Sequence, residues 1–92
     1  MKYVICWKNE YSCGIVKKDG KIASFLKSEK ALKFAIECAE EWRTKNQKRN
    51  NIKISYREPN EYVRGMVSAF DTDDVHQPPD NWIQYVLIVE NN

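Results

Sequence analysis

One histidine and three cysteines are the residues of this 92-residue sequence with the clearest chemical potential. A thiol beside an imidazole can act as an activated nucleophile, so the first arrangement to consider pairs the histidine with a cysteine. These residues are His76, Cys6, Cys13 and Cys38. Cys38 lies on the apolar face of a predicted helix and Cys6 lies within a predicted strand, where free cysteine is usually a small apolar side chain. The sequence therefore predicts a protein that is not an enzyme.

Carboxylates and the histidine also raise the question of a metal site. Asp71, Asp73 and His76 offer suitable ligands, but an EF-hand starting at Asp71 would need Gly and Glu where His76 and Trp82 stand. Asp73 and Asp74 are neighbours in one loop, whereas acid–base catalysis needs carboxyl groups that converge from separate elements. The cysteines lack the close ligand pairs of structural zinc sites, and the three glycines are too far apart for a phosphate-binding loop. We expect no metal and no cofactor.

The length and composition predict a single domain that spans residues 1–92. No segment approaches the roughly 18 apolar residues of a membrane span, so we expect no membrane association. The cysteine count is odd and there is no CxxC spacing, which argues against a disulfide framework and favours the reducing cytoplasm. A composition rich in Lys, Asn and Ile suggests an AT-rich coding genome.

The charges are divided unevenly along the chain. Residues 1–57 contain 14 Lys and Arg against 6 Asp and Glu, a net charge of +8, whereas residues 58–92 contain 1 against 7, a net charge of −6. Such a split marks either a basic surface beside an acidic one or two segments that attract each other on folding. Both explanations remain open at the level of the sequence.

Acidic residues gather in a long loop, 71–81, between two predicted strands. The candidate residues of this loop and its end are Asp71, Asp73, Asp74, His76, Asp80 and Trp82. Long loops are often functional, and apolar anchors ringed by charge are typical of protein interfaces. We therefore predict a small protein-binding or inhibitor module with a protein partner. A compact domain of this kind from an AT-rich genome fits a phage- or mobile-element-encoded inhibitor of a host or defence protein.

The basic residues of the first 57 positions support a different function, nucleic-acid binding. The candidates are Lys17, Lys18 and Lys21 at a hairpin, Lys45, Lys48 and Arg49 at a helix end, and Lys53 and Arg57 on a strand. Together they can neutralise phosphates if they converge on one face. Lysines at turns and helix ends are also the commonest solvated residues, and arginine, which binds phosphate in a bidentate manner, is scarce here.

The clearest predicted element, around which the other elements are arranged, is an amphipathic helix over residues 28–46. Ser28 is its expected N-cap. Alternating apolar residues predict strands over 2–8, 11–17 and 22–26 before the helix, with Asp19 and Gly20 in the turn between the second and third. The same pattern predicts strands over 52–57, 62–70 and 82–89 after it, with the last one central and covered on both faces. Gly14 marks a bulge or a close approach.

This order, βββ-α-βββ, predicts an α+β domain in which an antiparallel sheet of five or six strands carries one helix on one face. One helix covers only one face, so either the sheet curls or its other face is open to a partner. An exposed sheet edge allows either a monomer or a homodimer. The expected core comprises Ile5, Trp7, Ile15, Phe25, Leu32, Ala35, Ala39, Trp42, Ile54, Val67, Tyr85 and Leu87.

Overall fold

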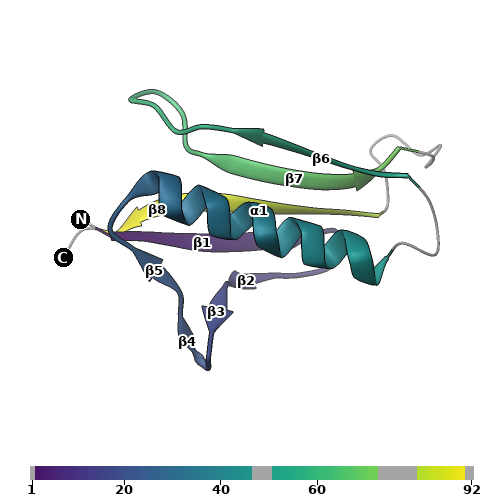
Figure 1. Ribbon diagram of the computed structural model, residues 1–92, viewed down its shortest axis with the longest axis horizontal. Coiled ribbons are helices and arrows are strands. Elements are labelled where there is room, and N and C mark those ends of the chain that lie inside the picture. Colours follow the sequence, from purple (N-terminus) through teal and green to yellow (C-terminus); the bar gives the residue numbers. More distant parts are fainter. Residues whose placement is uncertain (1, 47–50, 73–80, 91–92) are drawn as a thin grey trace.

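The computed structural model describes residues 2–46, 51–72 and 81–90 (Figure 1). Their elements follow in the order β1 (Lys2–Asn9), β2 (Cys13–Ile15), β3 (Lys17–Lys18), β4 (Lys21–Ile22), β5 (Ser24–Phe25), α1 (Ser28–Lys45), β6 (Ile52–Arg57), β7 (Met66–Asp71) and β8 (Trp82–Glu90). One helix with an antiparallel six-stranded sheet confirms the predicted α+β class.

The sheet places the first and last strands side by side at its centre. Its strand order is β2-β1-β8-β7-β6, and β5 pairs with the other end of β1 on the same side as β2. The β1–β8 pairing runs from Lys2 opposite Glu90 to Asn9 opposite Ile83, which makes it the longest ladder among the described strands. Because β1 and β8 are far apart in sequence, the middle of the sheet forms only when the two ends of the chain meet.

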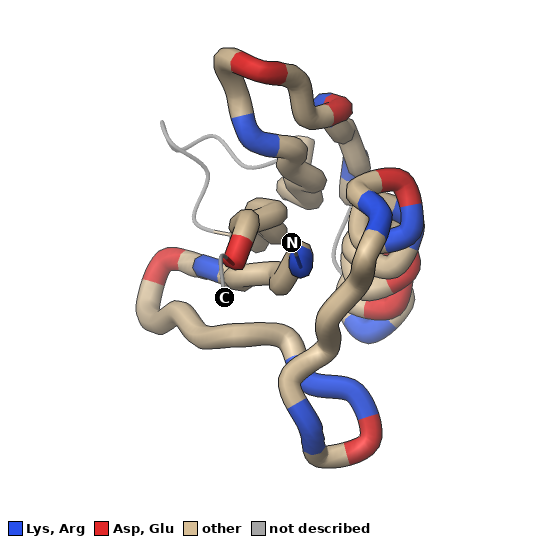
Figure 2. The backbone as a smooth tube through the Cα atoms, turned by 90° about the vertical axis from the view of Figure 1, so that its left-hand side faces the viewer, with Lys and Arg blue, Asp and Glu red and all other residues tan. Residues whose placement is uncertain are grey.

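The helix α1 lies across one face of this sheet (Figure 2). Ala31, Leu32, Ala35 and Ala39 are buried at helical spacing, and three of these four are alanines, so the helix axis can approach the strands closely. They pack in one cluster with the residues of β1, β7 and β8 that point towards α1. Fully buried Ile5, Val67 and Leu87 form the centre of that core.

The helix begins one residue away from the predicted cap. Lys27 is the N-cap with extended backbone, and its side chain makes no capping hydrogen bond, while Ser28 is the first helical residue. The predicted capping role of Ser28 is therefore wrong. At the other end, the Asn46 side chain donates to the Trp42 carbonyl at 2.8 Å and covers one of the helix's terminal acceptors.

The expected three-stranded meander before the helix is interrupted. Strands β2 and β5 stay in the main sheet, while β3 and β4 leave it as a separate two-stranded hairpin. Asp19 (φ 53°) and Gly20 (φ 80°) both have positive φ at its tip, as a two-residue turn of the I′ type requires. We call Lys17–Ile22 the basic arm, because three of its six residues are lysines.

Three further expectations need correction. Ile15, assigned to the core, is 43% exposed because it pairs with Cys6, which points away from α1. The strand expected from residue 62 begins at Met66, after the buried Gly65. Strand β8 is central as predicted, but no described helix or strand covers its second face. The other eleven expected core residues are buried or packed against the core.

Candidate binding surfaces

The sheet face opposite α1, which we call the open face, is unusually apolar. Residues paired across neighbouring strands share a face, so the register identifies its members. The half-buried apolar residues of this face are Cys6, Met66, Phe70, Trp82, Val86 and Ile88. A solvated sheet face normally alternates with polar residues, whereas β8 is apolar at most positions of both faces. The open face therefore has the composition of a surface that is buried in a contact.

A hollow interrupts the open face beside its largest side chains. It has a volume of about 430 Å³ and is lined by Ser55, Ser68, Ala69, Phe70, Trp82, Ile83 and Gln84. Phe70 and Trp82 are register partners on β7 and β8, so their rings stand at one end of it. Ser55 pairs with Ser68, and Ser68 with Gln84, which adds a row of hydrogen-bonding groups. The hollow can receive one apolar side chain that carries a polar tip.

Cations surround the apolar centre of the open face. Exposed Lys53 and Arg57 stand on it at the β6 edge, and exposed Lys2 and Lys8 stand on it from β1. Lys2 is opposite the exposed carboxylate of Glu90, so the uncompensated cations of the rim are Lys8, Lys53 and Arg57. The Arg57 Nε donates to the Arg64 carbonyl at 3.1 Å, which holds that guanidinium close to the sheet. Aromatic residues, Met and Arg within a charged rim are the composition that protein interfaces favour.

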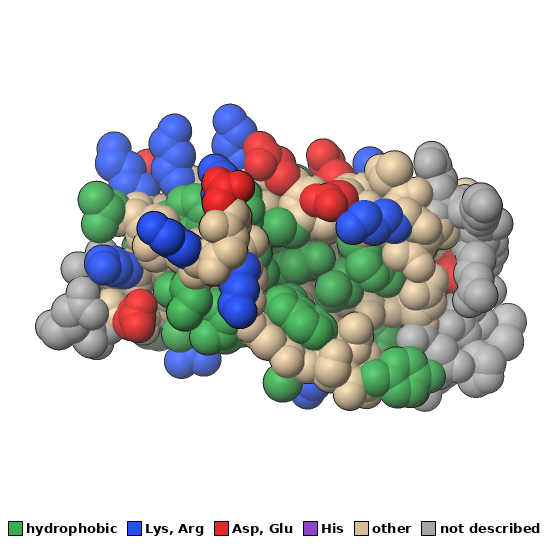
Figure 3. Space-filling model, turned by 90° about the horizontal axis from the view of Figure 1, so that it is seen from below, with side chains coloured by type: hydrophobic (Ala, Val, Ile, Leu, Met, Phe, Trp, Pro, Cys, Tyr) green, Lys and Arg blue, Asp and Glu red, His purple; other side chains and the backbone are tan. Residues whose placement is uncertain are grey.

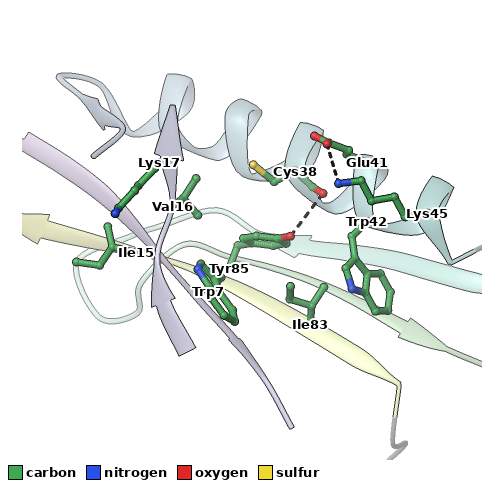
Figure 4. Close-up of a pocket in the computed structure, with 10 residues that line it drawn as sticks. All are labelled: Trp7, Ile15, Val16, Lys17, Cys38, Glu41, Trp42, Lys45, Ile83 and Tyr85. Carbon is green, nitrogen blue, oxygen red and sulfur yellow. Dashed lines mark hydrogen bonds and ion pairs between the residues drawn. The ribbon is translucent and has the colours of Figure 1, made fainter. Parts of the chain in front are cut away.

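A second depression lies on the helix side of the sheet, between the C-terminal half of α1 and strands β1, β2 and β8 (Figure 4). Its volume is about 470 Å³, and it is lined by Trp7, Ile15, Val16, Lys17, Cys38, Glu41, Trp42, Lys45, Ile83 and Tyr85. At its mouth Lys45 pairs with Glu41 at 3.2 Å. The Cys38 thiol and the Tyr85 phenol thus line the same depression.

The thiol and the phenol of this depression are both held in their neutral forms. Burial, and then the charges of Glu41 and Glu37, raise the pKa of the Cys38 thiol above its ordinary value. Burial raises the pKa of Tyr85 to about 12, with smaller contributions from Cys38 and Glu41. Because neither group is ionised near neutral pH, neither supplies the anionic nucleophile that covalent catalysis needs.

A third surface forms where the basic arm meets the N-terminal half of α1. The Lys18 Nζ lies 5.5 Å from the centroid of the Phe34 ring, and the Phe34 and Phe25 ring centroids lie 5.3 Å apart. Beside these rings is a depression of about 510 Å³, lined by Ser24, Phe25, Leu26, Lys27, Lys30, Lys33, Phe34 and Glu37. Figure 3 shows the side from which the arm projects, with Lys and Arg side chains gathered towards one end of it.

The basic residues singled out in the sequence do not form one surface. Lys17, Lys18 and Lys21 belong to the arm, whereas Lys53 and Arg57 stand on β6 at the opposite edge of the sheet. Lys45 is paired with Glu41 at the end of α1. Lys48 and Arg49 lie outside the described residues. Sequence reasoning did not single out Lys27, Lys30 and Lys33, although Lys30 and Lys33 share one side of the predicted helix and Lys27 directly precedes it.

The acidic loop is described only at its two ends. Asp71 is 5% exposed, and its place in the register puts its side chain on the α1 side of the sheet. Trp82 stands on the open face as the partner of Phe70. The remaining candidates, Asp73, Asp74, His76 and Asp80, lie outside the described residues. Of the predicted acidic-loop site, Trp82 is thus the member that the structure places on a candidate surface.

Other kinds of site receive no support from the described chain. Among residues 2–46, 51–72 and 81–90, no cluster of His, Cys, Asp or Glu could hold a metal ion. No helix in these ranges has both the length and the apolar character that crossing a membrane requires. Comparison with known proteins finds no matching family model, no similar curated protein and no similar solved structure. The surfaces themselves therefore carry the functional argument.

Proposed function

We propose that this domain is a non-enzymatic protein-binding module whose open face docks on another protein. The observation that carries the proposal is the group of half-buried apolar side chains on the sheet face that no described element covers. Burying apolar area of this kind is the main source of association free energy between proteins. Phe70 and Trp82, which form the last pair of the β7–β8 ladder, would be the aromatic anchors, and the hollow beside them would receive a side chain of the partner.

The cationic rim indicates the character of that partner. Lys8, Lys53 and Arg57 favour a surface in which acidic groups surround an apolar protrusion. An inhibitor that covers a functional surface of its target, encoded by a phage or mobile element, is one form of this role. The acidic residues before Trp82 remain predicted contributors to the same interface, because they closely precede Trp82 in the sequence.

Site-specific photocrosslinking in the cell that makes the protein tests this proposal. A photoreactive phenylalanine analogue at Phe70 should capture a protein partner, whereas the same analogue at the exposed Leu26, which lines the depression beside the N-terminal half of α1, should not. Val86→Arg should abolish the capture while the circular dichroism spectrum stays unchanged. Equal capture from both positions, or capture that survives Val86→Arg, would overturn the open face as the binding surface.

Nucleic-acid binding is a second candidate, and one observation favours it. Lys18 lies over the Phe34 ring, and the depression beside Phe25 and Phe34 is lined by Lys27, Lys30 and Lys33 together with Glu37. Cations around aromatic surface can bind phosphates and stack bases of a single strand.

Fluorescence anisotropy against single-stranded DNA and RNA at several salt concentrations tests this second candidate. If it holds, log K falls with log salt at a slope of about −2 to −3, as several phosphate contacts require. Lys27→Glu with Lys30→Glu should then remove the binding, while the matched pair Lys53→Glu with Arg57→Glu should leave it. If the protein binds neither DNA nor RNA even at low salt, nucleic-acid binding is excluded.

A further inference from the structure

Strand β6 is an uninterrupted exposed edge of the sheet. It is the outermost strand on its side, and no described strand pairs with its outer edge (Figure 1). The opposite edge is different, because β2 and β5 share it and the basic arm leaves the sheet between them. A partner strand of ordinary length, about five or six residues, can therefore pair along β6 but would meet the arm on the other side.

The hydrogen-bond pattern shows which backbone groups of β6 point outward. Thr72 N donates to Asn51 O at 3.0 Å, so this pair and every second pair after it exchange hydrogen bonds with β7. Lys53, Ser55 and Arg57 therefore direct their N–H and C=O groups towards β7. The backbone groups that point away from the sheet belong to Ile52, Ile54 and Tyr56. The strand thus presents three outward donors and three outward acceptors.

The two sides of an added strand would meet different surroundings. On the open face its side chains would lie beside exposed Lys53 and Arg57, and neither of these forms an ion pair with a described residue. On the helix side they would enter a depression of about 450 Å³ between α1 and β6. Its apolar lining comes from Leu32, Ile36 and Tyr56, and Tyr56 is 60% exposed. Four glutamates and one lysine also line it, so this side suits apolar side chains and excludes acidic ones: Glu29, Glu37, Glu40, Glu58 and Lys33. Successive residues of one strand point to these two places in turn.

We propose that β6 accepts an extended segment of a partner protein as an added strand, with acidic side chains beside Lys53 and Arg57 and apolar side chains in the α1–β6 depression. Charge complementarity selects the acidic side, and the outward hydrogen-bonding groups of β6 hold the backbone. The proposal rests on the protein-binding function above and adds the conformation and chemistry of the partner segment.

A second copy of this chain fits β6 less well. In an antiparallel pairing centred on Ser55, Lys53 of each copy would stand opposite Arg57 of the other, which is a repulsive arrangement. In the pairing centred on Ile54, Lys53 would face Ser55. Neither arrangement places a carboxylate of one β6 strand opposite a cation of the other. The lysine and arginine thus discourage self-pairing, as charges on natural edge strands do.

The probe for this proposal is a fluorescein-labelled synthetic peptide of about seven residues, the length of an ordinary strand, in which glutamate and valine alternate. The control peptide has lysine in place of each glutamate. Anisotropy titration against the full chain should show saturable binding of the acidic peptide and none of the basic one. Lys53→Glu with Arg57→Glu should weaken the acidic peptide at least about tenfold and create binding of the basic peptide.

Two matched variants test the backbone contacts. Tyr56→Pro removes an outward N–H that β7 does not use, and Tyr56→Ala removes the same side chain while it keeps that N–H. The proline variant should bind at least about tenfold more weakly than the alanine variant. Hydrogen exchange followed by NMR should show new protection at the amides of Ile52, Ile54 and Tyr56 when the acidic peptide is present.

The outcomes separate this proposal from the wider one. Absence of peptide binding, peptide protection confined to β7 and β8, or equal affinity of the two Tyr56 variants would each overturn the β6 proposal. Peptide-independent dimerisation that protects the same β6 amides would overturn it in favour of a second copy. In all these cases a crosslink from Phe70 would still support the open face as a binding surface, because that experiment reports on the open face alone. Conversely, loss of the Phe70 crosslink with intact peptide binding would overturn only the open face.

Discussion

The hydroxyl of Tyr85 lies 3.5 Å from the carbonyl oxygen of Cys38, and it donates the hydrogen bond that connects strand β8 with the middle of α1. Tyr85 is a core residue on the helix side of the sheet, and its ring also lines the depression beside α1 (Figure 4). A buried phenol with one acceptor is stable while it is protonated. The Tyr85 phenolate would have no proton to donate to the Cys38 carbonyl oxygen, so ionisation leaves two acceptors facing each other.

This contact predicts a stability loss at alkaline pH. Because the pKa of Tyr85 is raised from 10 to about 12, its contribution is complete below pH 10 and is lost as the pH rises towards 12. We expect the wild type to lose roughly 1 to 2 kcal/mol relative to Tyr85→Phe over that interval, after allowance for solvent screening. Urea unfolding of both proteins between pH 8 and 12 measures the difference. Parallel pH profiles would show that the phenol does not titrate differently on unfolding.

Much of the fold could be predicted because local patterns determine it. The apolar spacing over residues 28–46 identified α1 to within one residue of its end, and alternation identified β1, β6 and β8. Asp19 and Gly20 identified the tip of the arm, because few residues accept positive φ. What failed depends on neighbours in space. Ile15 alternates like a core residue, but its pairing opposite Cys6 turns its side chain away from α1.

The candidate surfaces were harder to predict than the elements. The position of α1 decides which face of β8 is open. Because β8 has apolar residues on both faces, its sequence does not show which of them α1 covers. Lys17 and Lys53 are both lysines of predicted strands in the basic part of the sequence. The strand order nevertheless places them at opposite edges of the sheet. The edge position of β6 likewise comes from the strand order, since its alternating pattern would suit an inner strand of a half-solvated sheet equally well.

A close contact between Gly14 and Trp7 predicts that Gly14 tolerates no side chain. A Cβ at Gly14 would lie 2.9 Å from Trp7 Nε1, so the indole must move. We expect Gly14→Ala to cost about 1 to 3 kcal/mol of unfolding free energy and to change the near-ultraviolet circular dichroism of the tryptophans.

Gly20→Ala is the matched control for Gly14→Ala. A Cβ at Gly20 would meet no atom within 4 Å, but the φ of 80° strains any other residue. This variant should cost about 1 kcal/mol through the backbone and leave the tryptophan spectrum unchanged. An unchanged spectrum in Gly14→Ala would mean that Trp7 does not occupy the space above Gly14.

The three cysteines should differ in reactivity. Cys13 is exposed on β2, Cys6 is half-buried on the open face, and Cys38 is half-buried with a raised thiol pKa. Because the thiolate is the reacting species, iodoacetamide at neutral pH should modify Cys13 first and Cys38 last, with rates at least about tenfold apart. Timed alkylation with peptide mass spectrometry gives each rate. Equal rates at Cys13 and Cys38 in the folded protein would contradict the described position of Cys38.

The basic arm should be held against α1 by Lys18 and Phe34. With the Lys18 Nζ 5.5 Å from the ring centroid, the cation–π contact should contribute about 0.5 to 1 kcal/mol. A double-mutant cycle of Lys18→Ala and Phe34→Leu, measured by urea unfolding, isolates that coupling from the separate effects of each change. Lys17 on the same arm lines the other depression, so a cycle of Lys17→Ala with Phe34→Leu should give no coupling. Coupling in both cycles would point to a general charge effect, and coupling in neither would mean that the arm does not rest on α1. Since the Lys18 cycle reports the arm's position, it also decides whether Lys27, Lys30 and Lys33 share a surface with the arm.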